Sequence, residues 1–233
     1  MAMNPKPDDP HPEGYQFIRK TLRGRRFVIP GRQAVDCFNG CVLSYCEIDI
    51  LVGPLRFRSP VDFHGCLLSA TSIRVADGRV AEAPWTNTTF EDCTFSGKFR
   101  TCEFGDVPHS RHLVHGAERF DVVNCSFDEA ILDQCVFYGC ALDTCRMPAW
   151  PHVLFRNPWH YRDAVKRLDL PESFGTAKIV TGMLLRHADE VVVWHLPSID
   201  PECDLKHARR VLSQLPCVEI IDSRSRKTAA PSR

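Results

Sequence analysis

The sequence predicts a mainly β fold, a solenoid followed by a small α/β unit. A large apolar residue recurs at every fifth position between residues 125 and 147, and the same spacing recurs in earlier segments. After residue 150 the pattern changes to alternating helical and strand-like stretches. With 233 residues, 25% of them charged and 44% hydrophobic, the chain has a globular composition and is long enough for one or two domains.

The period of five is clearest in "CSFDEAILDQCVFYGCALDTCRM", residues 125–147. A helix has about 3.6 residues per turn and would scatter every fifth residue around its axis, whereas a strand would send these residues to alternate faces. A chain that turns a corner after every five residues would place them all inside. The expected inward residues are large Phe127, Leu132, Phe137, Leu142 and Met147, preceded two positions earlier by small Cys125, Ala130, Cys135, Cys140 and Cys145.

Earlier segments continue this phase. The large residues expected inside are Phe38, Leu43, Ile48, Phe63, Leu68, Ile73, Phe90, Phe95 and Phe104. Residues 51–60, 76–87 and 105–117 break the phase, so we expect loops or distorted sides there.

These stretches resemble the pentapeptide repeat family, whose consensus is a small residue, Asp or Asn, Leu or Phe, and two polar residues. The resemblance covers about residues 36–149 and implies a right-handed quadrilateral β-helix with one repeat on each side. Residues 125–147 depart from the consensus in two ways: cysteine dominates the small position, and Ser, Ile, Val, Ala or Arg follows it in place of Asp or Asn.

The twelve cysteines predict packing rather than chemistry. Buried thiols act as small hydrophobic groups, and the sequence has no C-x-x-C pair of the kind that zinc sites use. We therefore expect no cofactor, with metal binding and disulfides as the alternatives. Nine cysteines occupy the small inward position, namely Cys41, Cys46, Cys66, Cys93, Cys102, Cys125, Cys135, Cys140 and Cys145.

The segment before the repeats is basic. Residues 1–14 are polar and proline-rich, which predicts a disordered tail rather than a signal peptide. Residues 15–35 form either a cap for the solenoid or a contact for phosphate or an acidic partner, and we favour the cap. In the cap, Phe17, Leu22 and Phe27 would cover the open end. The basic residues of this segment are Arg19, Lys20, Arg23, Arg25, Arg26 and Arg32.

Residues 150–222 predict a small α/β unit, and residues 223–233 a disordered basic tail. We expect helices after Asn157, over about 174–187 and after Asp200, with strands at "EVVVWHL" and "VEIID". A strand, helix and strand in this order suit a parallel arrangement. Two strands are too few for a free sheet, so the unit must rest on the solenoid, on its own helices or on another chain.

No catalytic motif is present, and we predict a non-catalytic protein–protein interaction module or scaffold rather than an enzyme. Its C-terminal unit would bind another protein or a second copy of the chain. The candidate interface residues are Val192, Trp194 and Leu212, because an apolar run such as "VVVW" needs cover from water. His195 lies within this run and is interpreted as a hydrogen-bonded core residue.

Two other functions remain open. The first is a DNA mimic that regulates or protects a DNA-binding enzyme, as family members do for gyrase. Residues 88–147 hold ten acidic against five basic residues, with Asp128, Asp133 and Asp143 expected on the surface. The second is a metal protein or enzyme that uses His109, His112 and His115. Because no apolar run is long enough to span a membrane, and because the formal net charge is zero, we expect a cytoplasmic protein that binds neither membranes nor nucleic acid directly.

Overall fold

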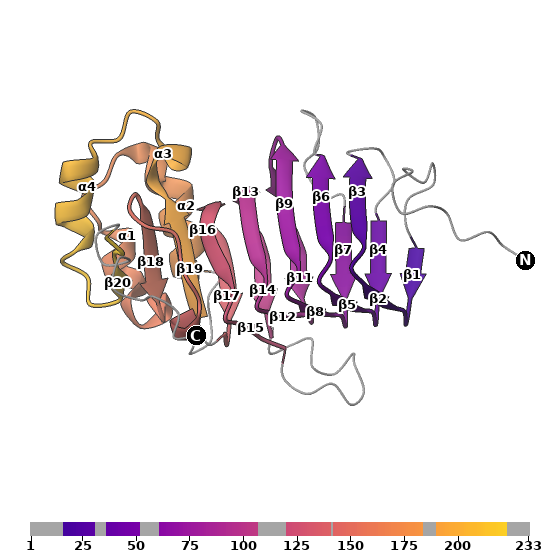
Figure 1. Cartoon of the computed structure of the whole chain (residues 1–233). Coiled ribbons are helices and arrows are strands. Elements are labelled where there is room, and N and C mark those ends of the chain that lie inside the picture. Colours follow the sequence, from indigo (N-terminus) through magenta and orange to yellow (C-terminus); the bar gives the residue numbers. More distant parts are fainter. Residues whose placement is uncertain are drawn as a thin grey trace, which may run out of the picture.

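The computed structural model describes residues 16–30, 36–51, 61–106, 120–140, 142–183 and 190–222. These residues form a mainly β structure in which short strands follow one another along the molecule, and the α-helices lie beyond residue 160 (Figure 1). We call residues 16–147 the repeat region and residues 150–222 the C-terminal unit. No helix in the described ranges is both long and apolar enough to cross a membrane.

The described strands form four sheets, and in all but one case successive strands of the repeat region belong to different sheets. The first sheet contains β1 (Gln16–Ile18), β4 (Asp36–Asn39) and β7 (Val61–His64). The second contains β2 (Thr21–Arg23), β5 (Val42–Ser44), β8 (Leu67–Ser69), β12 (Thr89–Glu91) and β15 (Val122–Val123). The third contains β3 (Arg26–Pro30), β6 (Glu47–Leu51), β9 (Ser72–Asp77), β13 (Thr94–Arg100), β10 (Val80–Ala81) and β16 (Ser126–Asp133). The fourth contains β11 (Pro84–Thr86), β14 (Glu103–Gly105), β17 (Cys135–Tyr138), β19 (Glu190–His195), β18 (His152–Arg156) and β20 (Val218–Glu219).

Left-handed residues mark the turns between successive strands and explain the period of five. Their φ angles are positive, and most of their backbone N–H groups donate to a carbonyl of the neighbouring layer, as Arg19 does to the Asn39 carbonyl at 2.8 Å and Tyr45 to the Ser69 carbonyl at 3.0 Å. The chain therefore changes direction at intervals of about five residues. These turn residues include Arg19, Gly24, Gly40, Tyr45, Gly65, Ala70, Glu82, Asn87, Asp92, Asn124, Gln134 and Gly139.

The pattern of inward residues is already present over residues 16–30, ahead of residue 36. Phe17 pairs in parallel register with Phe38, Leu22 with Leu43, and Phe27 with Ile48. The basic segment that we expected as a cap thus adds one strand to each of three sheets in the same phase.

For residues 76–87 we expected loops or distorted sides, and the structure shows sides with a shifted phase rather than a loop. This stretch includes β10 and β11, whose Val80 and Trp85 are fully buried and lead at intervals of five to Phe90 and Phe95. The extra residues after β9 shift the phase, which hid these positions. Phe99, which the period also misses, is buried beside Trp85 with ring centroids 5.9 Å apart.

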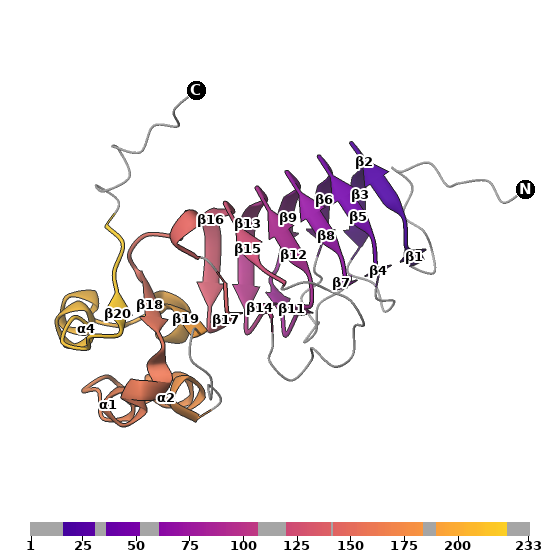
Figure 2. The same cartoon turned by 90° about the horizontal axis from the view of Figure 1, so that it is seen from below.

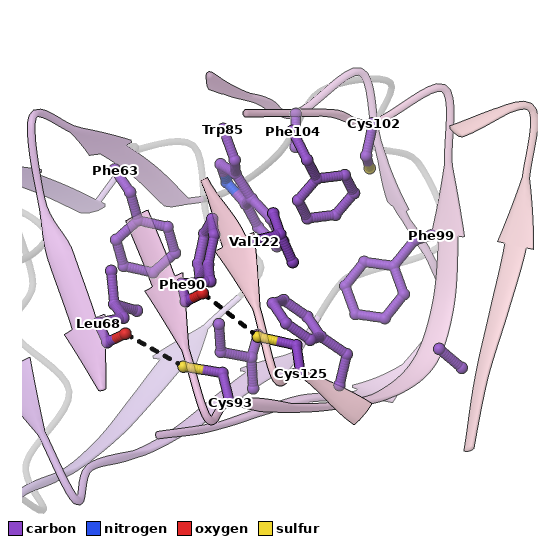
Figure 3. Close-up of a cluster of buried hydrophobic side chains, with 14 of the residues drawn as sticks. Phe63, Leu68, Trp85, Phe90, Cys93, Phe99, Cys102, Phe104, Val122 and Cys125 are labelled. Atoms are coloured by element: carbon purple, nitrogen blue, oxygen red, sulfur yellow. Dashed lines mark hydrogen bonds between the residues drawn. The ribbon is translucent and has the colours of Figure 1, made fainter. Parts of the chain in front are cut away.

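The interior of the repeat region is one continuous apolar cluster. All fourteen large residues expected inside, from Phe38 to Met147, are buried. Their aromatic rings contact one another across the sheets; the Phe95 and Phe127 rings stack at 4.5 Å, and those of Phe104 and Phe137 at 4.8 Å. The side chains that point into this interior include both large rings and small thiols (Figure 3).

The thiols of this interior act as hydrogen-bond donors. Cys93 donates to the Leu68 carbonyl and Cys125 to the Phe90 carbonyl, both at 3.4 Å (Figure 3). Burial raises the pKa of the Cys66 thiol to about 11, so that it is protonated at neutral pH and can donate to the Phe38 carbonyl at 3.0 Å. All twelve cysteines are free thiols; of the nine at small inward positions, Cys140 and Cys145 are half-buried and the others buried.

The C-terminal unit continues the fourth sheet with antiparallel strands. β19 pairs with β17 on one side and with β18 on the other, and β20 pairs with the far side of β18. β18 is the strand that the sequence analysis missed. β19 and β20 run in the same direction as expected, but β18 lies between them, so the predicted parallel pair does not form.

Short helices pack on the sheet of the C-terminal unit (Figure 2). They are α1 (Arg162–Lys166), α2 (Gly175–Met183), α3 (Leu196–Ile199) and α4 (Leu205–Leu212), with 3₁₀ turns at Leu142–Thr144, Pro158–Tyr161 and Glu172–Phe174. α4 begins later than predicted because Asp204, not Asp200, caps it: its carboxylate accepts from the N–H groups of Lys206 and His207. Asn157 has a left-handed backbone and makes no side-chain cap.

The apolar run of β19 is explained by cover on both faces. Val191 and Val193 face the apolar cluster of the repeat region, whereas Val192 and Trp194 belong to a second cluster with α1, α2 and α4. A strand that is buried on both faces reads as a continuous apolar run. The unit therefore rests on the end of the repeat region and on its own helices.

Candidate functional site

Two adjoining hollows lie on the outer surface of the C-terminal unit. The larger, which we call the α1–α4 hollow, has a volume of about 480 Å³. The second has a volume of about 380 Å³ and shares Ala164 and Arg167 with the first. The α1–α4 hollow is lined by Ala164, Arg167, Leu168, Asp169, His207, Arg210, Val211, Gln214 and Leu215.

α4 supplies one wall of this hollow. Ala208 and Leu212 are fully buried and fix the orientation of the helix against the sheet. Its opposite side then presents His207 and Arg210 to the hollow. Val211 is nearly buried and lies at the floor.

α1 and the turn after it supply the other wall. Val165 is fully buried and Leu168 nearly so, which anchors this short helix. Arg167 follows the last residue of α1, and its Nε donates to the Asp163 carbonyl at 3.0 Å. The remainder of its guanidinium is exposed beside the hollow.

His207 holds Arg210 in place. Arg210 Nη2 lies 3.0 Å from His207 Nδ1, and His207 Nε2 lies 3.0 Å from the Asp169 carbonyl oxygen. A guanidinium can only donate, so Nδ1 accepts and Nε2–H donates. This contact leaves Arg210 with further N–H groups for another acceptor.

Neither arginine of the α1–α4 hollow is neutralised. Among the described residues, no carboxylate lies within ion-pair distance of Arg167 or Arg210. Nearby arginines differ: Arg209 contacts the Asp222 carboxylate at 2.9 Å, and Arg162 lies 3.9 Å from that of Asp163. The lining therefore combines apolar Leu168, Val211 and Leu215 with two arginines that form no ion pair among the described residues and with the exposed Asp169 carboxylate.

The second hollow adds an aromatic and basic surface. The Arg162 guanidinium lies over the Trp159 ring, 4.3 Å from its centroid. Such a cation–π contact holds the guanidinium without neutralising its charge. Across residues 159–169 and 204–215 there are six Lys and Arg residues against three Asp residues.

The three predicted interface residues do not form a surface. Val192, Trp194 and Leu212 are fully buried in the second apolar cluster. The Trp194 indole N–H donates to Thr181 Oγ1 at 2.9 Å, and its ring lies 4.4 Å from that of Phe155. Because the chain itself covers these residues, they are unavailable to a partner in this structure.

Of the four histidines considered in the sequence analysis, only His195 lies within the described residues. His109, His112 and His115 lie outside the described residues, and within the described ranges no group of metal-ligating side chains comes together. His195 is half-buried rather than in the core, and its Nδ1 lies 2.6 Å from Ser198 Oγ. Burial lowers the pKa of His195.

The acidic residues expected on the surface are paired with arginines. Asp133 is buried, contrary to prediction, and lies 3.4 Å from Arg100 Nε. Asp128 and Asp143 lie 3.4 Å and 2.9 Å from guanidinium nitrogens of Arg146 and Arg156. These contacts offset part of the negative charge that a DNA mimic would need.

Arg26 of the N-terminal basic segment belongs to an ion-pair network. Asp49 on β6 accepts from Arg26 on β3 at 2.8 Å and from Arg74 on β9 at 2.7 Å. These hydrogen bonds, first that of Arg74, hold the pKa of the Asp49 carboxyl below its usual value. The network links three adjacent strands of one sheet, which gives these three charged residues a structural role.

The sequence analysis did not single out Arg167 and Arg210, because no motif includes them. The available signal was their position beside buried Leu168 and Val211, at the junction of apolar and polar faces. No protein family, curated protein or solved structure matches this chain.

Proposed function

We propose that the protein is a non-catalytic interaction module. In this proposal the repeat region is a right-handed quadrilateral β-helix of the pentapeptide repeat type, and the C-terminal unit binds a partner protein through the surface over α1 and α4. The β-helix would act as a rigid support.

The register of the parallel strands supports the β-helix proposal. Along the second sheet, Leu22, Leu43, Leu68, Phe90 and Val122 pair in order as parallel neighbours. A second series of parallel pairs joins Phe27, Ile48, Ile73 and Phe95 along the third sheet. Left-handed turns separate the two series, as a polygonal coil requires.

The binding proposal is carried by one observation. Arg167 and Arg210 line the same hollow and have no carboxylate partner among the described residues. Exposed guanidinium groups bind carboxylates and phosphates with paired, directional hydrogen bonds. The site therefore suits an acidic segment of another protein, and the apolar floor formed by Leu168, Val211 and Leu215 suits an apolar part of that segment.

An affinity-capture experiment with matched variants tests this function. The full-length protein would be compared with the double variant Arg167→Gln and Arg210→Gln in lysate of its own host. The control is Lys166→Gln with Lys206→Gln, which removes the same charge from the same two helical segments at residues that do not line the hollow.

We expect the wild type and the control to capture the same partner, and the arginine variant to lose it. Thermal unfolding of all three proteins would verify that each is folded. If the arginine variant retains every partner, or if the control loses them equally, the α1–α4 surface is not the binding site.

A further inference from the structure

We propose that the α1–α4 hollow binds a phosphorylated side chain of the partner protein. This inference rests on the proposed function and adds the chemistry of the group that enters the hollow. Three features support it: the charge of the hollow, the geometry of its donors and its size.

The charge of the hollow suits an anion. Arg167 and Arg210 contribute two positive charges that form no ion pair among the described residues, and the exposed Asp169 carboxylate of the same lining contributes one negative charge. A phosphorylated side chain carries about −1.5 to −2 charges at pH 7, whereas a carboxylate carries one. A phosphoryl group therefore offers the guanidinium groups of this lining more charge and more acceptor oxygens than a carboxylate does.

The donor geometry also favours phosphate. Guanidinium groups present planar forks of N–H donors that match the oxygens of phosphate. Arg210 is held by His207, which in turn is held by the Asp169 carbonyl, and Arg167 is held at Nε by the Asp163 carbonyl. Each side chain is therefore oriented through one nitrogen and keeps others for a ligand, which lowers the entropy lost on binding.

The size of the hollow leaves room for a stem beneath the phosphoryl group. At about 480 Å³ it exceeds the volume of a single phosphate ion, and its floor is formed by apolar Leu168, Val211 and Leu215. The carbon atoms of a phosphorylated residue would contact this floor, while the Gln214 amide lies on the same lining as a further donor. The Asp169 carboxylate, at 94% exposure, lies in water, where its repulsion of a bound anion is screened.

Synthetic peptides provide the test. Two acidic nonapeptides, one with a central serine and one with a central tyrosine, would each be prepared with and without phosphate on that residue. Binding to the full-length protein would be measured by fluorescence anisotropy at physiological salt. We expect at least one phosphopeptide to bind tenfold or more tightly than its unphosphorylated form.

The same variants show whether this gain arises in the hollow. Arg167→Gln with Arg210→Gln should remove the gain, and Lys166→Gln with Lys206→Gln should keep it. Circular dichroism and thermal unfolding of each variant would show that the fold is retained. The proposal is overturned if neither phosphopeptide gains tenfold, or if the lysine variant loses the gain as fully as the arginine variant.

Affinity capture from lysate treated with phosphatase separates this inference from the proposed function. If phosphatase-treated lysate still yields a partner that only the arginine variant fails to capture, the module binds through this surface but does not require phosphate. If phosphatase treatment removes the partner, the two proposals stand together. Failure of capture before treatment would contradict the proposed function itself.

Discussion

Phe104 lies at the centre of the aromatic interior, and its replacement by alanine should be among the most destabilising changes in the repeat region. The ring is fully buried and lies 4.8 Å from that of Phe137, 5.6 Å from that of Trp85 and 5.8 Å from that of Phe95. Removing a buried phenylalanine ring costs about 3–5 kcal/mol, and aromatic pairs add about 0.5–1.5 kcal/mol each beyond area burial. Because several pairs are lost together, we expect a value near the upper end of the first range.

Phe17 provides a matched control at the other end of the repeat region. It is half-buried, and its ring contacts those of Phe38 at 5.2 Å and Phe27 at 5.7 Å. With partial exposure and fewer ring contacts among the described residues, Phe17→Ala should cost about half as much, roughly 1.5–2.5 kcal/mol.

Urea denaturation followed by far-ultraviolet circular dichroism measures both costs, because the free energy of unfolding falls linearly with denaturant. The expected result is a larger decrease for Phe104→Ala than for Phe17→Ala with similar slopes. Equal decreases, or a larger one for Phe17→Ala, would refute the argument that burial within the aromatic interior determines the stability of this region.

Two further predictions concern buried carboxylates. Asp133→Ala should destabilise the protein by about 1–3 kcal/mol, because the Asp133 side chain has 7% exposure and contacts Arg100. Asp143, at 88% exposure, is the control, and Asp143→Ala should change the free energy of unfolding by less than about 0.5 kcal/mol. Chemical denaturation compares the two variants, and equal effects would show that Asp133 is not buried in solution. The second prediction concerns pH, because the guanidinium groups of Arg74 and Arg26 hold the pKa of Asp49 below its ordinary value of 3.8. The stabilisation from the charged Asp49 carboxylate is fully present above pH 3.8 and is lost as the pH falls through the lower pKa of the folded state. The difference in melting temperature between wild type and Asp49→Asn should therefore shrink as the pH is lowered from about 5 to about 2, and a difference that stays constant would contradict the assignment.

The inward positions of the repeat region could be predicted because their signal is local. A large apolar residue at every fifth position depends only on where the chain turns, and the structure places left-handed residues at such turns. The same locality explains the errors. The extra residues after β9 shifted the phase and hid Val80 and Trp85, and the many basic residues near Phe17 drew attention to charge instead of spacing.

The C-terminal unit was harder to predict because its pairing is not local. β18 has only five residues, and it lies between β19 and β20, which are distant from it in the sequence. No short pattern specifies such a neighbour. The α1–α4 hollow has the same origin, since Arg167 and Arg210 come together only when α1 and α4 pack on one sheet face.

The C-terminal unit packs on the repeat region through one face of its sheet, and the helices that line the proposed binding site cover the opposite face. Val191 and Val193 of β19 face the apolar cluster of the repeat region, and β19 occupies the edge of β17 that would otherwise be open. Val192 and Trp194 point the other way, toward the helices that carry the hollow on their outer side. Because Arg167 and Arg210 are exposed and neither belongs to the apolar clusters that hold the unit, exchange of either residue should leave the docking of the unit intact. A loss of partner binding in these variants would therefore report on the hollow and not on the fold.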